Sequence, residues 1–165
     1  MKKTILIALA TMACAAHAHV TLEYEVAAAG ASYKATFRVG HGCGASPTKQ
    51  IAVTIPDGVK GAHPMPKPGW TLELRKDADR VARVVWTAKT REDMLPSTQY
   101  DEFVLVARMP DQAGSLYWPV SQVCEEGRAD WKDVPQAGQS LAELKSPAAY
   151  LEVIPADGTA SGHHH

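Results

Sequence analysis

The chemistry available to His19 depends on where the chain is cut. Residues 1–18 are typical of a secretory leader, because two lysines precede a mostly apolar stretch and Ala16-His17-Ala18 fits the small-x-small cleavage rule. Cleavage there would make His19 the first residue of the mature protein. An N-terminal histidine offers its α-amino nitrogen and its Nδ1 to one metal ion, and an amine with a pKa near ~8 yields its proton to a metal at neutral pH. Two nitrogens held in one plane suit tetragonal Cu(II).

Copper held by His19 needs more ligands, since Cu(II) normally takes four near-equatorial donors. Glu102 has a local argument, because it directly precedes the apolar run 103–106 and the start of a strand is a rigid support for a side chain. A second imidazole would come from His41, in a glycine-rich turn, or from His63, in a proline-rich segment. The sequence leaves the choice open, with a solvated surface charge as the alternative for most of the other acidic candidates: Glu23, Glu25, Asp101, Glu125 and Glu126.

The cysteines favour an oxidising compartment. Cys14 leaves with the leader, so Cys43 and Cys124 remain and allow one pairing. A disulfide is favoured over a thiolate metal site, because oxidising compartments rarely leave two cysteines free. A bridge around a loop of about 80 residues would add ~4 kcal/mol of stability in the chain-entropy model.

Length and charge limit the class of protein. Removing 18 residues from 165 leaves 147, enough for one domain with a real core, and removing two lysines from 17 basic residues leaves 15 against 18 acidic ones. The resulting charge of −3 argues against a nucleic-acid partner. No later apolar run is long enough to span a bilayer, so we expect a periplasmic or extracellular protein. The domain is expected over 19–155, followed by a tail, 156–165, whose last three histidines resemble a purification tag.

Short alternating or β-branched runs separated by turns predict an all-β domain. A single helical turn or two is expected over Ser140–Lys145, and the proline-rich segment 63–70 is expected to be a stiff surface loop. About eight short strands predict a β-sandwich or a Greek-key barrel. The expected strands are 20–26, 33–39, 50–55, 71–75, 81–87, 103–107, 116–123 and 151–154.

The tryptophans divide into two groups. Trp86 and Trp118 lie in strand-like runs and are expected in the core. Trp131 lies in a polar stretch after Cys124, and the sequence by itself favours a lid on the core over a part of a site. Motifs of serine hydrolases, phosphate-binding loops and zinc proteases are absent from the sequence.

Several of these stretches together resemble one known family. They are His19-Val20-Thr21, His41-Gly42-Cys43-Gly44-Ala45-Ser46-Pro47-Thr48, Pro66-Lys67-Pro68-Gly69-Trp70, Tyr100-Asp101-Glu102-Phe103, and Cys124-Glu125-Glu126-Gly127 followed by Trp131. The chain is similar, from His19 to about Pro135, to the YcnI-like family of exported bacterial copper-binding proteins, also called the DUF1775 domain.

The resemblance implies a cupredoxin-like or immunoglobulin-like sandwich with one Cu(II). The ion would be bound by the amine and imidazole of His19, with Glu102 as a further metal residue. Trp131 would close the site without donating an electron pair, since an indole N–H is only a donor. The implied role is a copper chaperone or homeostasis factor. Its implied partners are the copper ion, a copper-transport membrane protein or another chaperone, and a second copy in a metal-linked dimer.

Two other functions compete with this one. A copper-dependent oxidative enzyme of the histidine-brace type requires a second histidine ligand, which His41 or His63 would have to supply. A metal-free interaction sandwich predicts no stoichiometric Cu(II) binding. The non-enzymatic copper-binding protein is the favoured hypothesis.

Overall fold

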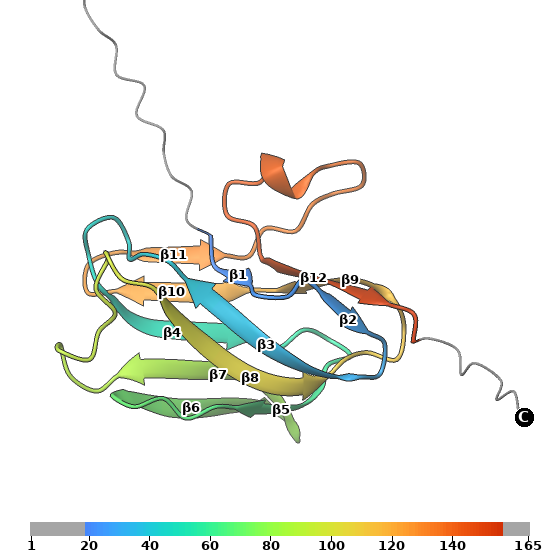
Figure 1. Cartoon of the computed structure of the whole chain (residues 1–165), viewed down its shortest axis with the longest axis horizontal. Helices are drawn as coiled ribbons and strands as arrows, with labels where there is room; N and C mark the ends of the chain where they lie inside the picture. Colours follow the sequence, from blue (N-terminus) through green and yellow to red (C-terminus); the bar gives the residue numbers. More distant parts are fainter. Residues whose placement is uncertain (1–18, 157–165) are drawn as a thin grey trace, which may run out of the picture.

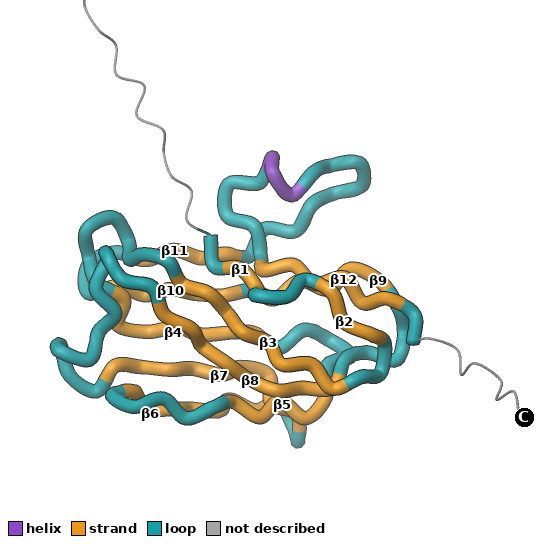
Figure 2. Tube along the Cα trace, in the orientation of Figure 1, coloured by secondary structure: helices purple, strands orange, loops and turns teal. Residues whose placement is uncertain are grey.

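The structure, a computed structural model, describes residues 19–156, so the expected leader and the histidines at 163–165 lie outside the described residues. The regular secondary structure of this part of the chain is almost entirely β-strand (Figures 1 and 2). Among the described residues, no helix has the length and apolar character to cross a membrane. The elements are β1 (Thr21–Leu22), β2 (Val26–Ala28), β3 (Ser32–Val39), β4 (Thr48–Thr54), β5 (Lys60–Pro64), β6 (Trp70–Asp77), β7 (Arg80–Ala88), β8 (Asp101–Arg108), β9 (Gly114–Trp118), β10 (Val120–Cys124), β11 (Arg128–Trp131), the 3-10 turn η1 (Leu141–Glu143) and β12 (Ala149–Ile154).

Two antiparallel sheets form the sandwich. The first has the strand order β1-β3-β8-β5, and the second has the order β11-β10-β4-β7-β6. Figure 1 shows β3 and β8 crossing in front of β4 and β7, and the buried side chains of both sheets form one cluster. The prediction of an all-β sandwich is confirmed.

Alternation along the strands builds the core. In β3, Tyr33, Ala35, Phe37 and Val39 are buried, because every second residue faces the other sheet. Phe37 packs edge-on against Trp118, with 5.7 Å between ring centroids. Trp86 and Trp118 are 1% and 0% exposed, which confirms both as core residues.

Two expected strands are each divided between sheets. The run 20–26 contains β1 and β2, which belong to different sheets, and the three exposed residues between Leu22 and Val26 carry the chain from one sheet to the other. The run 116–123 divides at Pro119, which has no N–H to donate to a ladder. β2 and β9 flank β12 in a small third sheet, and predicting one strand in each run was therefore wrong.

The proline-rich segment is a loop only in part. His63 and Pro64 end β5, which is an edge strand of the first sheet. An edge position tolerates proline, because the missing N–H has no ladder partner to satisfy there. The connection from Met65 to Gly69 then leads to Trp70, which is 7% exposed and packs in the core.

A long loop follows β11 and stands above the sandwich (Figure 2). The hydrogen bonds that close its base include one from the Ala148 N–H to the Asp133 carbonyl (2.9 Å) and one from the Ser146 N–H to the Asp133 carboxylate (3.0 Å). Its tip holds η1, where Ser140 and Glu143 cap each other's backbone reciprocally. The predicted helical turn is therefore confirmed.

Candidate metal centre

His19 directly precedes β1 and is held by two buried neighbours. Val20 and Leu22 are 2% and 1% exposed, so they fix this short strand to the core. Because alternate residues face opposite ways, His19 and Thr21 lie on the other side, and both are partly buried. The backbone nitrogen of His19 therefore lies directly before a segment that is firmly packed against the core.

The imidazole of His19 contacts Trp131. The two ring centroids are 5.5 Å apart and the rings meet edge-on at 61°. Trp131 comes from β11, the edge strand of the second sheet, whereas β1 is the edge strand of the first. The site therefore lies where these two edges meet, and it joins residues that are 112 positions apart in the chain.

Trp131 is itself fixed by a buried polar residue, Gln122. The indole N–H of Trp131 donates to Gln122 Oε1 at 3.3 Å. The amide nitrogen of Gln122 donates to the His41 carbonyl (2.7 Å) and to Thr48 Oγ1 (2.8 Å). Gln122 is 1% exposed, and these partners compensate for the cost of burying its amide.

Sequence reasoning missed Gln122 and the strand that carries Trp131. A signal for the first was present, because in β10 Val120, Gln122 and Cys124 alternate with Ser121 and Val123 and so share the inward face. The signal for β11 was weak, since Arg128–Trp131 has only four residues and two of them are charged.

A disulfide anchors the turn that contains His41. Cys43 and Cys124 are bonded, with their Cα atoms 6.0 Å apart and a sequence separation of 81, which confirms the predicted bridge. Gly42 has no room for a side chain, because a Cβ there would lie 1.9 Å from the Ser46 carbonyl oxygen. The turn is therefore held closely against β10.

Glu102 lies on the outer face of the first sheet. The strand register pairs Thr21 with Arg38 and Arg38 with Glu102, so the three side chains form one row across β1, β3 and β8. Two strand spacings of about 4.8 Å separate Glu102 from β1. The structure thus places Glu102 on the same face as His19, two strands away across the first sheet.

The carboxylate of Glu102 is engaged by Tyr100. The phenol O–H donates to Glu102 Oε1 at 2.5 Å. Desolvation, the hydrogen bond to Glu102 and the charge of that carboxylate raise the pKa of Tyr100 to about 12, and Glu23 adds to this rise. Tyr100 therefore remains a neutral hydrogen-bond donor beside the carboxylate throughout the physiological pH range.

The other candidates are more scattered. Asp101 binds Lys67 (2.6 Å), and Glu125 binds Arg91 (2.8 Å), so both are engaged in ion pairs. His63 is exposed on β5, at the opposite edge of the first sheet from β1. The structure therefore does not bring His63 to His19.

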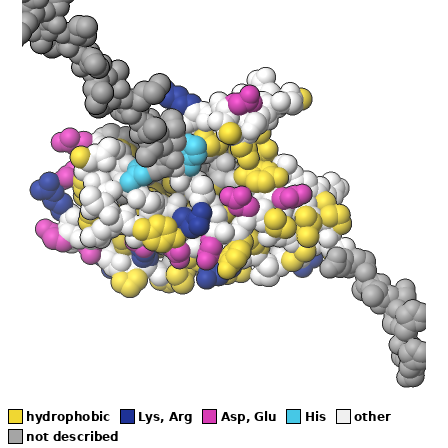
Figure 3. Space-filling model, turned by 45° about the horizontal axis from the view of Figure 1, so that its top comes forward, with side chains coloured by type: hydrophobic (Ala, Val, Ile, Leu, Met, Phe, Trp, Pro, Cys, Tyr) yellow, Lys and Arg dark blue, Asp and Glu magenta, His cyan; other side chains and the backbone are white. Residues whose placement is uncertain are grey.

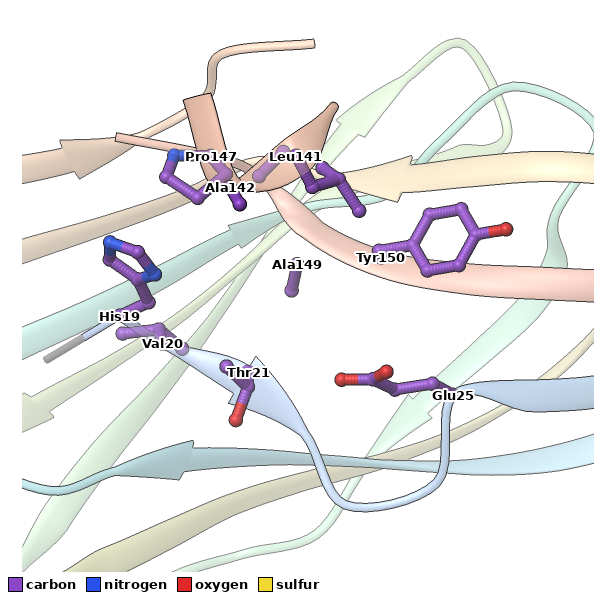
Figure 4. A pocket seen from close by; sticks show the side chains of 10 residues that line it. His19, Val20, Thr21, Glu25, Leu141, Ala142, Pro147, Ala149 and Tyr150 are labelled. Carbon is purple, nitrogen blue, oxygen red and sulfur yellow. The ribbon is translucent and has the colours of Figure 1, made fainter. Parts of the chain in front are cut away.

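A pocket of about 430 Å³ opens beside His19. Figure 4 shows His19 and Glu25 toward its two ends, with Leu141, Ala142 and Pro147 of the long loop on one wall. Glu25 is thus the acidic candidate that shares a cavity with His19. This cavity leaves one side of His19 accessible to small molecules.

The donor set around His19 is sparse. Within residues 19–156, no three side chains of the types His, Cys, Asp and Glu lie close enough together to hold a metal ion. Figure 3 shows histidine side chains gathered on the face near the start of the described chain. A metal at His19 would therefore depend on main-chain nitrogen, imidazole and water more than on a cage of side chains.

Comparison with known proteins assigns the chain to a family. The family described as "Domain of unknown function (DUF1775)" matches residues 19–153. The chain belongs to this family. The match begins at His19, so the family domain begins where the sequence predicts the mature protein to begin.

Two relatives extend this assignment. The copper-binding protein CutI of Bacillus subtilis (strain 168) is 28% identical over 136 residues, which are 79% of this chain and 65% of CutI. The chain thus matches slightly less than two thirds of the length of that relative. An uncharacterized protein from Nocardia farcinica with an immunoglobulin-like fold is 30% identical, with a TM-score of 0.71 over 82% of this chain and 97% of the other. The prediction of an immunoglobulin-like sandwich is confirmed.

Proposed function

We propose that the protein binds one Cu(II) through His19 and serves as a copper chaperone or homeostasis factor outside the cytoplasm. The observation that carries this proposal is the contact of His19 with Trp131 at the meeting edges of the two sheets. The relative CutI is named as copper-binding, and it supports the same ion for this family member. The immunoglobulin-like fold favours a binding protein over an enzyme.

The chemistry of His19 fits this ion. Removal of residues 1–18 would expose an α-amine that chelates copper together with Nδ1 of the same residue, and the packed β1 would hold both nitrogens in place. Trp131 would limit the access of water on one side of the metal. Glu102 is proposed as a further metal residue, acting directly or through water from its row on the outer face.

Exchange of copper suits a site of this composition. Few side-chain donors leave coordination positions open to water or to a partner's ligand, and the pocket beside His19 gives a partner a route to the ion. The proposed location is the periplasm or the exterior of the cell, supported by the leader and by the Cys43–Cys124 disulfide. The proposed partners are a copper-transport membrane protein or another copper chaperone, and a metal-linked dimer is a further proposal.

A titration of the processed chain tests the proposal. The protein should begin with His19, verified by mass, and should lack the histidines at 163–165 so that they cannot bind metal. We expect binding of one Cu(II) per chain and an electron paramagnetic resonance spectrum typical of tetragonal, nitrogen-rich copper.

The matched control adds one glycine before His19. The added residue turns the α-amine into an amide, so the chelate cannot form while every side chain is unchanged. We expect the one-to-one binding to be lost in this sample. Equal, weak binding by both proteins would contradict the proposal and leave the metal-free interaction sandwich as the better hypothesis.

A further inference from the structure

The two ring nitrogens of His41 differ in their hydrogen bonding. Its Nδ1 lies 2.6 Å from the Gly42 carbonyl oxygen. A carbonyl oxygen only accepts, so Nδ1 carries the proton and Nε2 presents a lone pair. Within the described residues Nε2 is buried and has no hydrogen-bond partner.

This arrangement is typical of a histidine that binds metal. Ligating histidines usually donate the N–H of the other ring nitrogen to a carbonyl or carboxylate, which fixes the tautomer and the ring orientation. A buried acceptor that stays unsatisfied costs about 1–3 kcal/mol, so a structure that keeps one benefits from a ligand there. His41 is therefore prepared to donate an electron pair from Nε2.

The strand register places His41 near His19. Thr21 pairs with Arg38 and Leu22 with Phe37, and continuing this register by two residues sets His19 opposite Gly40. His41 is the next residue after Gly40. A Cβ on Gly40 would meet no atom within 4 Å, so the space beside Gly40 is open.

A second, independent link joins the two histidines. Gln122 donates to the His41 carbonyl and accepts from the indole of Trp131, whose ring contacts His19. His41 and His19 thus each contact one member of the hydrogen-bonded pair Gln122 and Trp131.

We propose that His41 supplies a second imidazole, through Nε2, to the copper held by His19. The inference rests on the proposed function. The α-amine of His19, Nδ1 of His19 and Nε2 of His41 would fill three of the four near-equatorial positions that Cu(II) prefers. The disulfide, Gly42 and Gln122 together would hold the third donor in place before the metal arrives.

The test compares His41→Gln with His63→Gln in the processed, tag-free protein. Glutamine at 41 can still donate to the Gly42 carbonyl, and the main-chain carbonyl that holds Gln122 is unchanged. His63 is an exposed histidine at the far edge of the sheet, so its replacement controls for surface imidazole. Electron spin-echo modulation counts the imidazoles bound to Cu(II), and a competing chelator gives the dissociation constant.

We expect two imidazoles per copper in the wild type and in His63→Gln, and one in His41→Gln. The dissociation constant of His41→Gln should rise by more than about tenfold, since even the outer partners of ligating histidines are worth about 10- to 100-fold. The number of imidazoles bound to Cu(II) in the wild type is measured without any variant, so this part of the test holds even if His41→Gln does not fold.

A single imidazole in the wild type, with unchanged affinity in His41→Gln, would overturn this inference and leave the proposed function intact. Failure of the wild type to bind one Cu(II) would overturn both. Two imidazoles would also meet the ligand requirement of the oxidative-enzyme alternative, so the same count bears on that hypothesis.

Discussion

At the scale of single residues, Gln122 connects more of the site than any ligand candidate does. Its three hydrogen bonds reach Trp131, the His41 carbonyl and Thr48, and Thr48 is 0% exposed. An apolar residue at this position would fit the inward pattern of β10 better. The amide is therefore best explained by what it holds, namely the indole beside His19 and the turn that carries His41.

Replacing Gln122 with leucine should lower the free energy of unfolding by about 1–3 kcal/mol, because the His41 carbonyl and the Trp131 N–H lose their partners inside the core. Urea unfolding at neutral pH measures this change. Gln112→Leu, at an exposed position, is the matched control and should stay within about 0.5 kcal/mol of the wild type. A similarly small effect of Gln122→Leu would show that the network carries little stability.

Tyr33 gives a prediction on pH. Its O–H donates to the Tyr24 carbonyl, and burial, followed by the charges of Glu25 and Glu23, raises its pKa from 10.0 to about 12. Because the folded pKa lies above the unfolded one, the stabilising contribution is complete below pH 10 and is lost as the pH rises through 12.

The stability difference between the wild type and Tyr33→Phe should therefore shrink between pH 8 and pH 11. Phenylalanine lacks the ionisable group, so only the wild type carries the alkaline penalty. Denaturant unfolding at both pH values gives the two differences. An equal difference at pH 8 and at pH 11 would mean that Tyr33 ionises alike in the folded and the unfolded chain.

At the scale of elements, the site depends on short strands at sheet edges. β1 has two residues and β11 has four, yet they present His19 and Trp131 to each other. Such strands hold their positions through buried side chains more than through ladder bonds. β8 is longer and central, and it gives Glu102 a fixed place in a row with Arg38 and Thr21.

Glu102→Gln should weaken Cu(II) binding by about tenfold or more, with the fold unchanged. The amide keeps the size of the side chain and can still accept from Tyr100, so the loss of charge is the main change. Competition titration against a chelator measures the dissociation constant. Glu152→Gln, exposed on β12, removes the same charge elsewhere, and equal affinities in the two variants would exclude a specific role for Glu102.

Sequence alone predicted the parts of this fold that follow from local pattern. Alternation located most strands and placed Trp86 and Trp118 in the core, and the two cysteines that remain after the expected leader predicted the Cys43–Cys124 bridge. The division of 20–26 and 116–123 was missed, because alternation shows that a strand forms and not which sheet it joins. The expected leader and the final histidines lie outside the described residues.

The sequence predicted which residues belong to the candidate site better than it predicted how they are arranged. The pairing of His19 with Trp131 agrees with the expected residues, whereas the metal roles of His19 and Glu102 remain predictions. The importance of Gln122 and His41 depends on register and on hydrogen bonds between distant strands. Such relations exist only after the sheets have assembled, so no local pattern expresses them.

At the scale of the whole molecule, one covalent link secures the region around the site. The disulfide joins the turn after β3 to the end of β10, across 81 residues of chain. It thereby connects the first sheet to the second close to the edges where His19 and Trp131 meet. Stability and site geometry are consequently coupled through the same bond.

Replacing both Cys43 and Cys124 with serine should lower the free energy of unfolding by about 4 kcal/mol, because the unfolded chain regains the entropy of an 81-residue loop. Thermal unfolding with and without a reductant measures this loss. The reductant should lower the melting temperature of the wild type toward that of the variant and leave the variant unaffected. Equal melting temperatures would contradict the prediction.

The contact between His19 and Trp131 also makes the molecule its own optical probe. Cu(II) is paramagnetic and quenches the emission of an indole beside it, and Trp131 is the tryptophan whose ring contacts His19. Under the proposed function, loading would dim this fluorophore while the emission of Trp70, Trp86 and Trp118 continues as a constant background. Transfer of the ion to another protein could then be followed in real time, without a dye, as the fluorescence of Trp131 recovers.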